Sequence, residues 1–160
     1  MADLANAIQD HYPEDCAHCF GCGRLNEHGY RLKTYLEGEE TITRFTPAPE
    51  HTALPGFVYG GLVASLLDCH ATATGAAAAE RAAGREIGAG PAPRFVTASL
   101  KVDYLKPTPL GPELVIRGRA SRLEGRKVFV QATLSAGGII TARAEVLVVQ
   151  VPDRMRPRHA

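Results

Sequence analysis

One acidic residue, Asp68, lies in the middle of a stretch of apolar and small residues, "PGFVYGGLVASLLDCHATATGAAAAE", at positions 55–80. A carboxylate can attack a carbonyl carbon or remove a proton from water, so Asp68 is a candidate nucleophile or general base. The same stretch contains Gly60 and Gly61, and free N–H groups at the start of a helix can stabilise a developing oxyanion. A carboxylate and an oxyanion donor are two parts of an acyl-transfer site.

Helical spacing predicts which residues share a face with Asp68. Ala and Leu dominate the residues after Gly61, which predicts one long helix that ends at Gly84. At 3.6 residues per turn the core-facing stripe is Leu62, Leu66, Cys69, Ala73 and Ala76, and a second face holds Gly61, Ser65, Asp68, Thr72 and Gly75. Asp68 thus shares its face with small residues only, so a ligand can approach it closely. The alternative is a partly buried Asp68 bonded to Ser65, Thr72 or a strand.

A single copy of this helix cannot bring both groups to one substrate. Gly61 and Asp68 are separated by about 10 Å along the helix axis, at 1.5 Å per residue. Two copies of the helix, antiparallel about a two-fold axis, would place Asp68 of one subunit opposite Gly61 of the other. A catalytic Asp68 therefore predicts an obligate homodimer with two composite sites.

The rest of the chain predicts the elements that position this helix. Alternating runs at 30–38 and 40–47 predict two strands joined by a hairpin turn. The segment "GREIGAGPAPR" is too rich in Gly and Pro to be regular, and four β-like runs follow it, at 95–107, 113–124, 126–135 and 139–151. Short links among these four predict that they are antiparallel neighbours, because a parallel pair needs a long crossover.

One long helix and about six strands have one economical arrangement, in which an antiparallel sheet wraps around the helix. The predicted fold class is α+β with this hotdog architecture, and the small Ala side chains allow the sheet to wrap closely. We predict three regions: an N-terminal segment with a Cys/His cluster at 1–24, the hotdog domain at 25–151 and a flexible basic tail at 152–160.

Length, composition and charge limit the class of protein. The chain has 160 residues, 45% of them hydrophobic, which suits one compact domain. The 18 Lys and Arg residues nearly balance the 17 Asp and Glu residues, so the charge predicts no nucleic-acid partner and no membrane partner. The N-terminus lacks the pattern of a signal peptide, and no apolar run approaches the roughly 20 residues that span a bilayer. We expect a soluble cytoplasmic protein with reduced cysteines.

Three motifs carry a resemblance to a known family: "CFGCGRLNEHGYRLK" at 19–33, "PGFVYGGLVASLLD" at 55–68 and "TASLKVDYLKPTPLG" at 97–111. Together they resemble the hotdog-fold acyl-CoA thioesterases of the phenylacetate-pathway (PaaI-like) type. The resemblance runs from about Cys19 to Val149. It implies an enzyme that hydrolyses an acyl-CoA, or a similar acyl thioester, to the free acid and thiol. No cofactor is implied beyond the coenzyme A of the substrate, and the homodimer can pair into a homotetramer.

The resemblance also implies roles for individual residues. Asp68 falls on the catalytic carboxylate, and Gly61 falls on the oxyanion-hole glycine. Thr97 falls on a hydroxyl residue that helps to place the attacking water or the carboxylate. The predicted substrate-binding residues near this site are Gly60, Ser65 and Thr72.

Three side chains near Asp68 need separate assignments. Where many family members have His, this chain has Tyr59, whose phenol can donate a hydrogen bond to a thioester oxygen but is a poor base, with a reference pKa of about 10. We predict that Tyr59 orients the substrate. His70 is rotated about 200° from Asp68 on an ideal helix, so we predict that it packs in the core or an interface. Cys69 is predicted to be a buried structural thiol.

A cysteine cluster precedes the first strand. Cys16, Cys19 and Cys22 have a spacing that can supply zinc or iron–sulfur ligands. A tetrahedral site would need a fourth ligand from His11, His18 or His28, or from a neighbouring subunit. The matching family segment is metal-free, so we predict no metal, and instead a close-packed loop over the fold or near the acyl pocket.

A basic turn between two late strands contains Arg122, Arg126 and Lys127. Hotdog thioesterases often receive the coenzyme A phosphates at such a turn, and the planar guanidinium of Arg can bind two phosphate oxygens. The equally simple alternative is a set of solvated turn residues.

Two other functions remain open from the sequence. A hotdog hydratase or dehydratase would need an Asp and a His that converge on a carbon skeleton, which the spacing of Asp68 and His70 does not supply within one helix. A non-catalytic protein that binds an acyl-CoA or an apolar small molecule is the other alternative, and Tyr59 would then mark lost activity.

Overall fold

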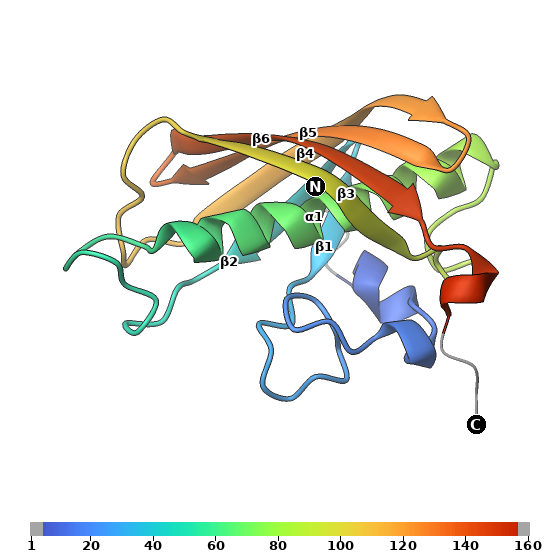
Figure 1. The fold of residues 1–160 in the computed structure, drawn as a ribbon, viewed down its shortest axis with the longest axis horizontal. Helices are drawn as coiled ribbons and strands as arrows, with labels where there is room; N and C mark the ends of the chain where they lie inside the picture. The colour runs from blue at the N-terminus through green and yellow to red at the C-terminus, as the bar shows by residue number, and fades with distance from the viewer. Residues whose placement is uncertain (1–4, 157–160) are drawn as a thin grey trace.

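The computed structural model describes residues 5–156, in which one α-helix packs against one antiparallel sheet (Figure 1). Helix α1 spans Gly60–Ala82. The strands are β1 (Thr34–Glu37), β2 (Glu40–Phe45), β3 (Phe95–Tyr104), β4 (Leu114–Glu124), β5 (Lys127–Ala136) and β6 (Ile139–Gln150), and the short 3-10 helices are η1 (Ile8–His11), η2 (Glu14–Cys16) and η3 (Asp153–Met155). The predicted α+β hotdog fold is confirmed.

The strands lie in the order β1-β2-β4-β5-β6-β3, so β1 and β3 form the two edges of the sheet. The prediction that the last four strands are neighbours in chain order is correct for β4, β5 and β6. It is wrong for β3, which pairs with β6. The linker 105–113 is longer than a hairpin turn and carries the chain across the sheet. On the way it contacts the loop before α1, where the Val58 N–H donates to the Thr108 carbonyl at 2.9 Å.

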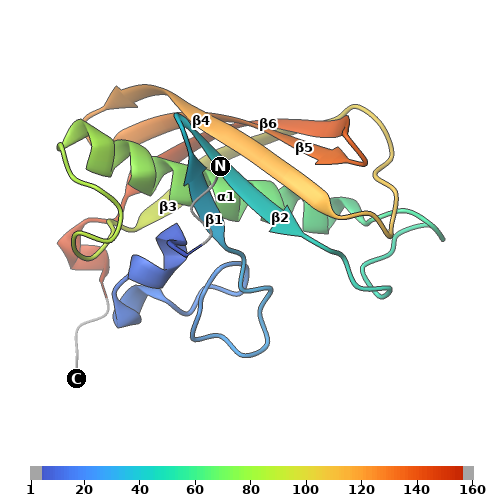
Figure 2. The ribbon, with the colours of Figure 1, turned by 180° about the vertical axis from the view of Figure 1, so that it is seen from behind.

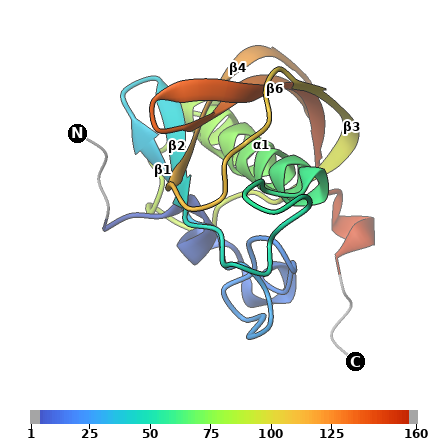
Figure 3. The same ribbon diagram turned by 90° about the vertical axis from the view of Figure 1, so that its left-hand side faces the viewer.

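The sheet curves around α1 (Figure 3). The many Ala residues of α1 allow this close approach. The predicted core stripe of Leu62, Leu66, Cys69, Ala73 and Ala76 is buried throughout. The helix also ends as predicted. Gly84 has φ +69°, a left-handed conformation that favours glycine, and its N–H donates to the Arg81 carbonyl.

The N-terminal segment covers the side of α1 that the sheet leaves open (Figure 2). Its contact with the sheet is polar and buried: the Gln9 amide donates to Thr34 Oγ1 at 2.9 Å and accepts from the Thr34 N–H at 2.8 Å. At the other end, Arg156 pairs with Asp15 at 2.9 Å. The last four residues of the predicted flexible tail, 157–160, lie outside the described residues. Within residues 5–156, no helix is both long enough and apolar enough to cross a membrane.

Candidate active site on helix α1

Asp68 is held by one strand contact on the side of α1 that faces the sheet edge. Its side chain is half-buried, and the Thr97 hydroxyl donates a hydrogen bond to Asp68 Oδ1 at 2.5 Å. A hydroxyl that donates to a carboxylate oxygen fixes the carboxylate and leaves its second oxygen for another group. The structure therefore brings together two of the four predicted catalytic residues.

A β-bulge in β3 sets the direction of Thr97. The pairing with β6 shifts between Thr97 and Ser99, so that Ala98 is an extra residue. Thr97 pairs with Val148, and after the bulge Tyr104 pairs with Ala142; both partners are fully buried. Thr97 and Tyr104, seven positions apart, therefore lie on the same inner face, where strict alternation would place them on opposite faces.

Tyr104 is a site residue that sequence reasoning missed. Its hydroxyl donates to the Gly60 carbonyl at 2.7 Å and so connects the edge strand to the start of α1. Burial raises the pKa of Tyr104, so its phenol stays protonated and can donate. The bulge was the missing signal, because without it the alternation of β3 assigns Tyr104 to the outer face.

The start of α1 is open, as an oxyanion site requires. Gly60 and Gly61 are exposed, and Tyr59, the residue before them, has an extended backbone with no side-chain cap on the first helical turn. The first N–H groups of an α-helix have no partner inside the helix. A Cβ on Gly61 would lie 2.6 Å from the Tyr59 ring, so glycine is required for this approach. Ser65 donates to the Gly61 carbonyl at 2.8 Å, and its binding of substrate stays a prediction.

Tyr59 lies in an aromatic cluster with Tyr30. The two hydroxyls are 3.3 Å apart, and this hydrogen bond raises the pKa of Tyr30 to about 12. Tyr30 also makes edge contacts with the rings of Phe20, Phe45 and His51. Tyr59 is thus held in place, and the Tyr30 phenol stays protonated near neutral pH. Its predicted orienting role remains a prediction, since no contact with Asp68 is formed within the described chain.

The face that carries Asp68 changes character along the helix. Its first half, with Gly61, Ser65 and Asp68, is exposed or half-buried. Thr72 and Gly75, in its second half, are buried, and the Thr72 hydroxyl donates to the Cys69 carbonyl at 2.9 Å. Ligands can therefore approach this face in the N-terminal half of α1. The buried Thr72 lies outside that half.

His70 is a fully buried core residue. Of the two predicted placements, core or interface, the structure has the core. Its Nδ1 is 2.8 Å from Thr43 Oγ1, and its Nε2 is 3.1 Å from Thr41 Oγ1. Burial lowers the pKa of His70 to about 3, so the imidazole is neutral near pH 7. Gly118 on β4 makes room for the ring, because a Cβ there would lie 2.7 Å from Nε2. His70 does not reach Asp68 or the surface.

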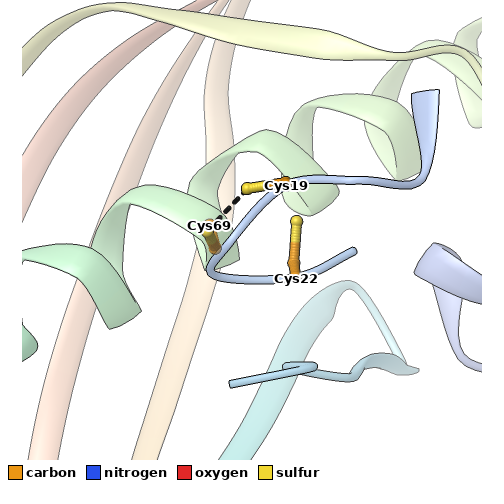
Figure 4. A group of neighbouring side chains, drawn as sticks. All are labelled: Cys19, Cys22 and Cys69. Carbon is orange, nitrogen blue, oxygen red and sulfur yellow. Dashed lines mark hydrogen bonds between the residues drawn. The ribbon is translucent and has the colours of Figure 1, made fainter. Parts of the chain in front are cut away.

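Cys69 lies on a third side of the helix and faces other thiols. The sulfurs of Cys19, Cys22 and Cys69 all lie within 4.8 Å of one another, and those of Cys19 and Cys69 are 3.9 Å apart (Figure 4). Hydrogen bonds with the thiols of Cys22 and Cys69 lower the pKa of Cys19. The same contacts with Cys19 raise the pKa values of Cys22 and Cys69. Sequence reasoning grouped Cys16 with Cys19 and Cys22, but Cys69, fifty positions after Cys19, takes the third place.

The basic turn between β4 and β5 lies on the surface. Arg122 is exposed, covers the Phe129 ring at 4.0 Å from its centroid and pairs with Glu124 at 3.0 Å. Arg126 and Lys127 are exposed beside it. Their predicted contact with coenzyme A phosphates remains a prediction.

Comparisons of the sequence with a family model and with curated proteins both identify thioesterases. Residues 55–145, more than half of the chain, match the Thioesterase superfamily. Acyl-coenzyme A thioesterase THEM4 from Xenopus laevis is 36% identical over 93 residues, which are 58% of this chain and 36% of that protein. The chain thus spans about a third of the length of the curated relatives it matches.

Two solved structures share the fold. A Thioesterase superfamily protein from Shewanella loihica PV-4 is 49% identical, with a TM-score of 0.65 over 79% of this chain and 96% of that chain. The E. coli PaaI protein from the phenylacetic acid degradation operon has a TM-score of 0.62 over 77% of this chain and 81% of that chain. At 10% identity, that second likeness shows the fold alone. The matched residues include both Asp68 and Thr97, and this chain belongs to the Thioesterase superfamily.

Proposed function

We propose that this protein hydrolyses an acyl-CoA, or a similar acyl thioester, to the free acid and the thiol, with Asp68 as the reacting carboxylate. The hydrogen bond from Thr97 to Asp68, on the half of α1 that ligands can approach, carries this proposal. Membership of the Thioesterase superfamily and the name of the Xenopus laevis relative support the reaction type.

Asp68 would act in one of two ways. As a general base it takes a proton from water, the resulting hydroxide adds to the thioester carbon, and the C–S bond breaks as the thiolate leaves and receives a proton. As a nucleophile it adds to the thioester carbon, the C–S bond breaks and the thiolate leaves and receives a proton; water then hydrolyses the resulting anhydride to the free acid and the Asp68 carboxylate. In both cases the negative charge on the carbonyl oxygen is stabilised by the Gly61 N–H, with Gly60 beside it. No cofactor takes part beyond the coenzyme A of the substrate.

The proposed site is completed by a second subunit. Strand β3 is an edge strand of ten residues, and a long unpaired edge is a template for pairing with another chain. Leu100 and Tyr104 belong to its inner face yet are 37% and 53% exposed, so α1 of the same chain covers each of them only in part. A second copy paired at this edge would cover them and bring its Gly61 toward Asp68. Pairing of such dimers into tetramers, and a cytoplasmic location, stay predictions.

The test is single-turnover cleavage of aromatic, short-chain and long-chain acyl-CoAs, with products followed by chromatography because the four thiols of the protein would react with a thiol-detecting dye. We expect cleavage of at least one ester by the native protein, and a loss of most of that rate in Asp68→Asn with binding retained. Binding of acyl-CoA by both proteins without cleavage by either would refute hydrolysis and favour the non-catalytic binding protein.

A hydratase or dehydratase is not supported. Such an enzyme needs an Asp and a His that converge on the substrate. His70 is fully buried and bonded to Thr41 and Thr43, so it does not share a surface with Asp68.

A further inference from the structure

We propose that Cys19, Cys22 and Cys69 form a zinc site that joins the N-terminal segment to the middle of helix α1, one residue after Asp68. Two of these thiols come from the loop before β1 and the third from the helix, and their sulfurs point toward one another (Figure 4). The proposal is independent of the proposed hydrolysis, since metal binding is measured directly.

The spacing of the sulfurs fits a tetrahedral zinc ion. With a Zn–S bond of 2.3 Å, two ligands of a tetrahedral site lie about 3.8 Å apart. Cys19 and Cys69 are 3.9 Å apart, and all three sulfurs lie within 4.8 Å of one another. Small movements would therefore bring all three onto one ion. A disulfide would need two sulfurs to approach to about 2.05 Å and would leave the third without a partner.

The loop is built to bring its two thiols against the helix. Cys19 and Cys22 have the two-residue separation typical of zinc ligands, and the Gly23 N–H closes the turn by donating to the Cys19 carbonyl at 2.7 Å. A Cβ on Gly21 would lie 2.3 Å from the Cys69 sulfur. Only glycine lets the backbone pass this close to Cys69, so the turn positions the three sulfurs before any metal binds.

The surroundings suit a negatively charged metal cluster. Zinc bound by three thiolates carries a net charge of −1, and Arg94 lies with its Nη2 4.0 Å from the Cys22 sulfur. The same guanidinium lies 5.0 Å from the centre of the Tyr12 ring. Among residues 5–156, the Tyr12 hydroxyl is a buried polar group without a hydrogen-bond partner. The hydroxyl would donate a hydrogen bond to a thiolate ligand of the cluster, which would satisfy it.

The ligand set selects a soft metal ion. Thiolates favour zinc over calcium or magnesium, which prefer oxygen ligands. No other Cys, His, Asp or Glu of the described residues joins the three thiols, and we assign the fourth position to a water molecule. Because the ligands lie on two segments of the chain, zinc would stabilise the packing of the N-terminal segment on α1.

The experiment uses the full chain, stripped of metal and reduced, and titrated with Co²⁺ as a coloured probe for zinc. We expect one Co²⁺ per chain, with the absorption bands of tetrahedral thiolate–cobalt, and its displacement by one equivalent of Zn²⁺. Cys19→Ser, Cys22→Ser and Cys69→Ser should each weaken Zn²⁺ binding by at least about 100-fold, more than the loss of an outer hydrogen-bond partner costs. Cys16→Ser, the matched control, should bind like the native chain.

A second measurement decides the question if a variant does not fold. Zn²⁺ is added to the native chain before alkylation, and the modified cysteines are identified by mass spectrometry. The metal-free chain is alkylated in parallel, and because Cys22 and Cys69 are buried even without metal, we expect Zn²⁺ to add protection mainly at Cys19 and to leave Cys16 reactive. No metal uptake by the chain with four free thiols would overturn the proposal. Equal protection of Cys16, unchanged binding by a folded Cys69→Ser variant, or a Cys19–Cys69 disulfide that forms in the presence of Zn²⁺ would also overturn it.

Discussion

Two ionisable side chains that lie two positions apart on α1, Asp68 and His70, have contrasting surroundings. Asp68 is half-buried, has one strand partner and lies on the half of the helix that ligands can approach. His70 is fully buried, and β2 contacts both of its ring nitrogens through Thr41 and Thr43. The residue types alone would make His70 the more common acid–base catalyst near neutral pH. The way the sheet wraps the helix instead leaves only the carboxylate open to a substrate.

The largest expected effect concerns the N-terminal half of α1, which carries Gly61 and Asp68 and is called the open region below. It tests whether a site in this region needs a second subunit. Asp68→Asn and Gly61→Ala should each lose most activity, the latter because its Cβ would displace the Tyr59 ring. A heterodimer with one variant in each subunit retains one intact composite site, so we expect about half of the native rate. It can be purified by co-expression with two different tags.

A site contained within one chain would give a different result for that heterodimer. Each subunit would then carry one defect, and no intact site would exist. Rates as low as those of the two homodimeric variants would therefore contradict the composite site, provided that gel filtration shows the dimer.

Substitution of the buried His70 should change the stability of the protein and not the rate of hydrolysis. His70→Gln cannot keep both threonine contacts in the same geometry, and a buried polar group left without its partner costs roughly 1–3 kcal/mol. We expect a loss of about 2 kcal/mol in the free energy of unfolding, measured in urea. The exposed His28 provides the control, because His28→Gln should change stability by less than about 0.5 kcal/mol. A His70→Gln protein as stable as the native one would contradict the assigned hydrogen bonds.

The contact between the open region and the sheet should have a smaller effect on rate. Thr97→Val removes the hydroxyl that positions Asp68, and a hydrogen bond to a charged group is worth about 1.5 kcal/mol. We expect the single-turnover rate to fall about tenfold with acyl-CoA binding retained. Ser99→Ala, on the other side of the bulge and exposed, should keep the native rate. Equal losses in both variants would show a general disturbance of β3.

The smallest predicted effect is a pH dependence that originates from His70. Its folded pKa of about 3 lies below the value of about 6.5 in an unfolded chain, so between these values the unfolded state binds more protons. Stability therefore falls as the pH drops below about 6.5, by about 1 kcal/mol between pH 7 and 5.5. Urea unfolding of the native protein and of His70→Gln at both pH values isolates this contribution, since the variant should lack it. The same pH dependence in both would assign it to other groups.

The sequence predicted the helix and most of the sheet because these depend on local patterns. The Ala-rich run and Gly84 define α1, and the alternation of the strands defines their extents. The position of β3 at the far edge was not predictable from link length alone, because the linker 105–113 is long enough to cross the sheet.

The site was predicted in part for a similar reason. Asp68 and Thr97 could be paired through the family resemblance, and the structure joins them. Tyr104 was missed because one extra residue in β3 reverses the alternation, which no composition or period reveals. The partnership of Cys69 with Cys19 and Cys22 was missed because it depends on how the N-terminal loop packs on the helix.

The most direct test of the contrast between Asp68 and His70 compares the hydrolysis rates of one variant at each position. Asp68→Asn and His70→Gln are assayed with the best acyl-CoA substrate under single-turnover conditions, and each rate is divided by the fraction of folded protein. We predict a loss of about 10²- to 10⁴-fold for Asp68→Asn and a rate within about threefold of native for His70→Gln. Equal losses in both, or a larger loss in His70→Gln, would contradict the assignment of the chemistry to Asp68.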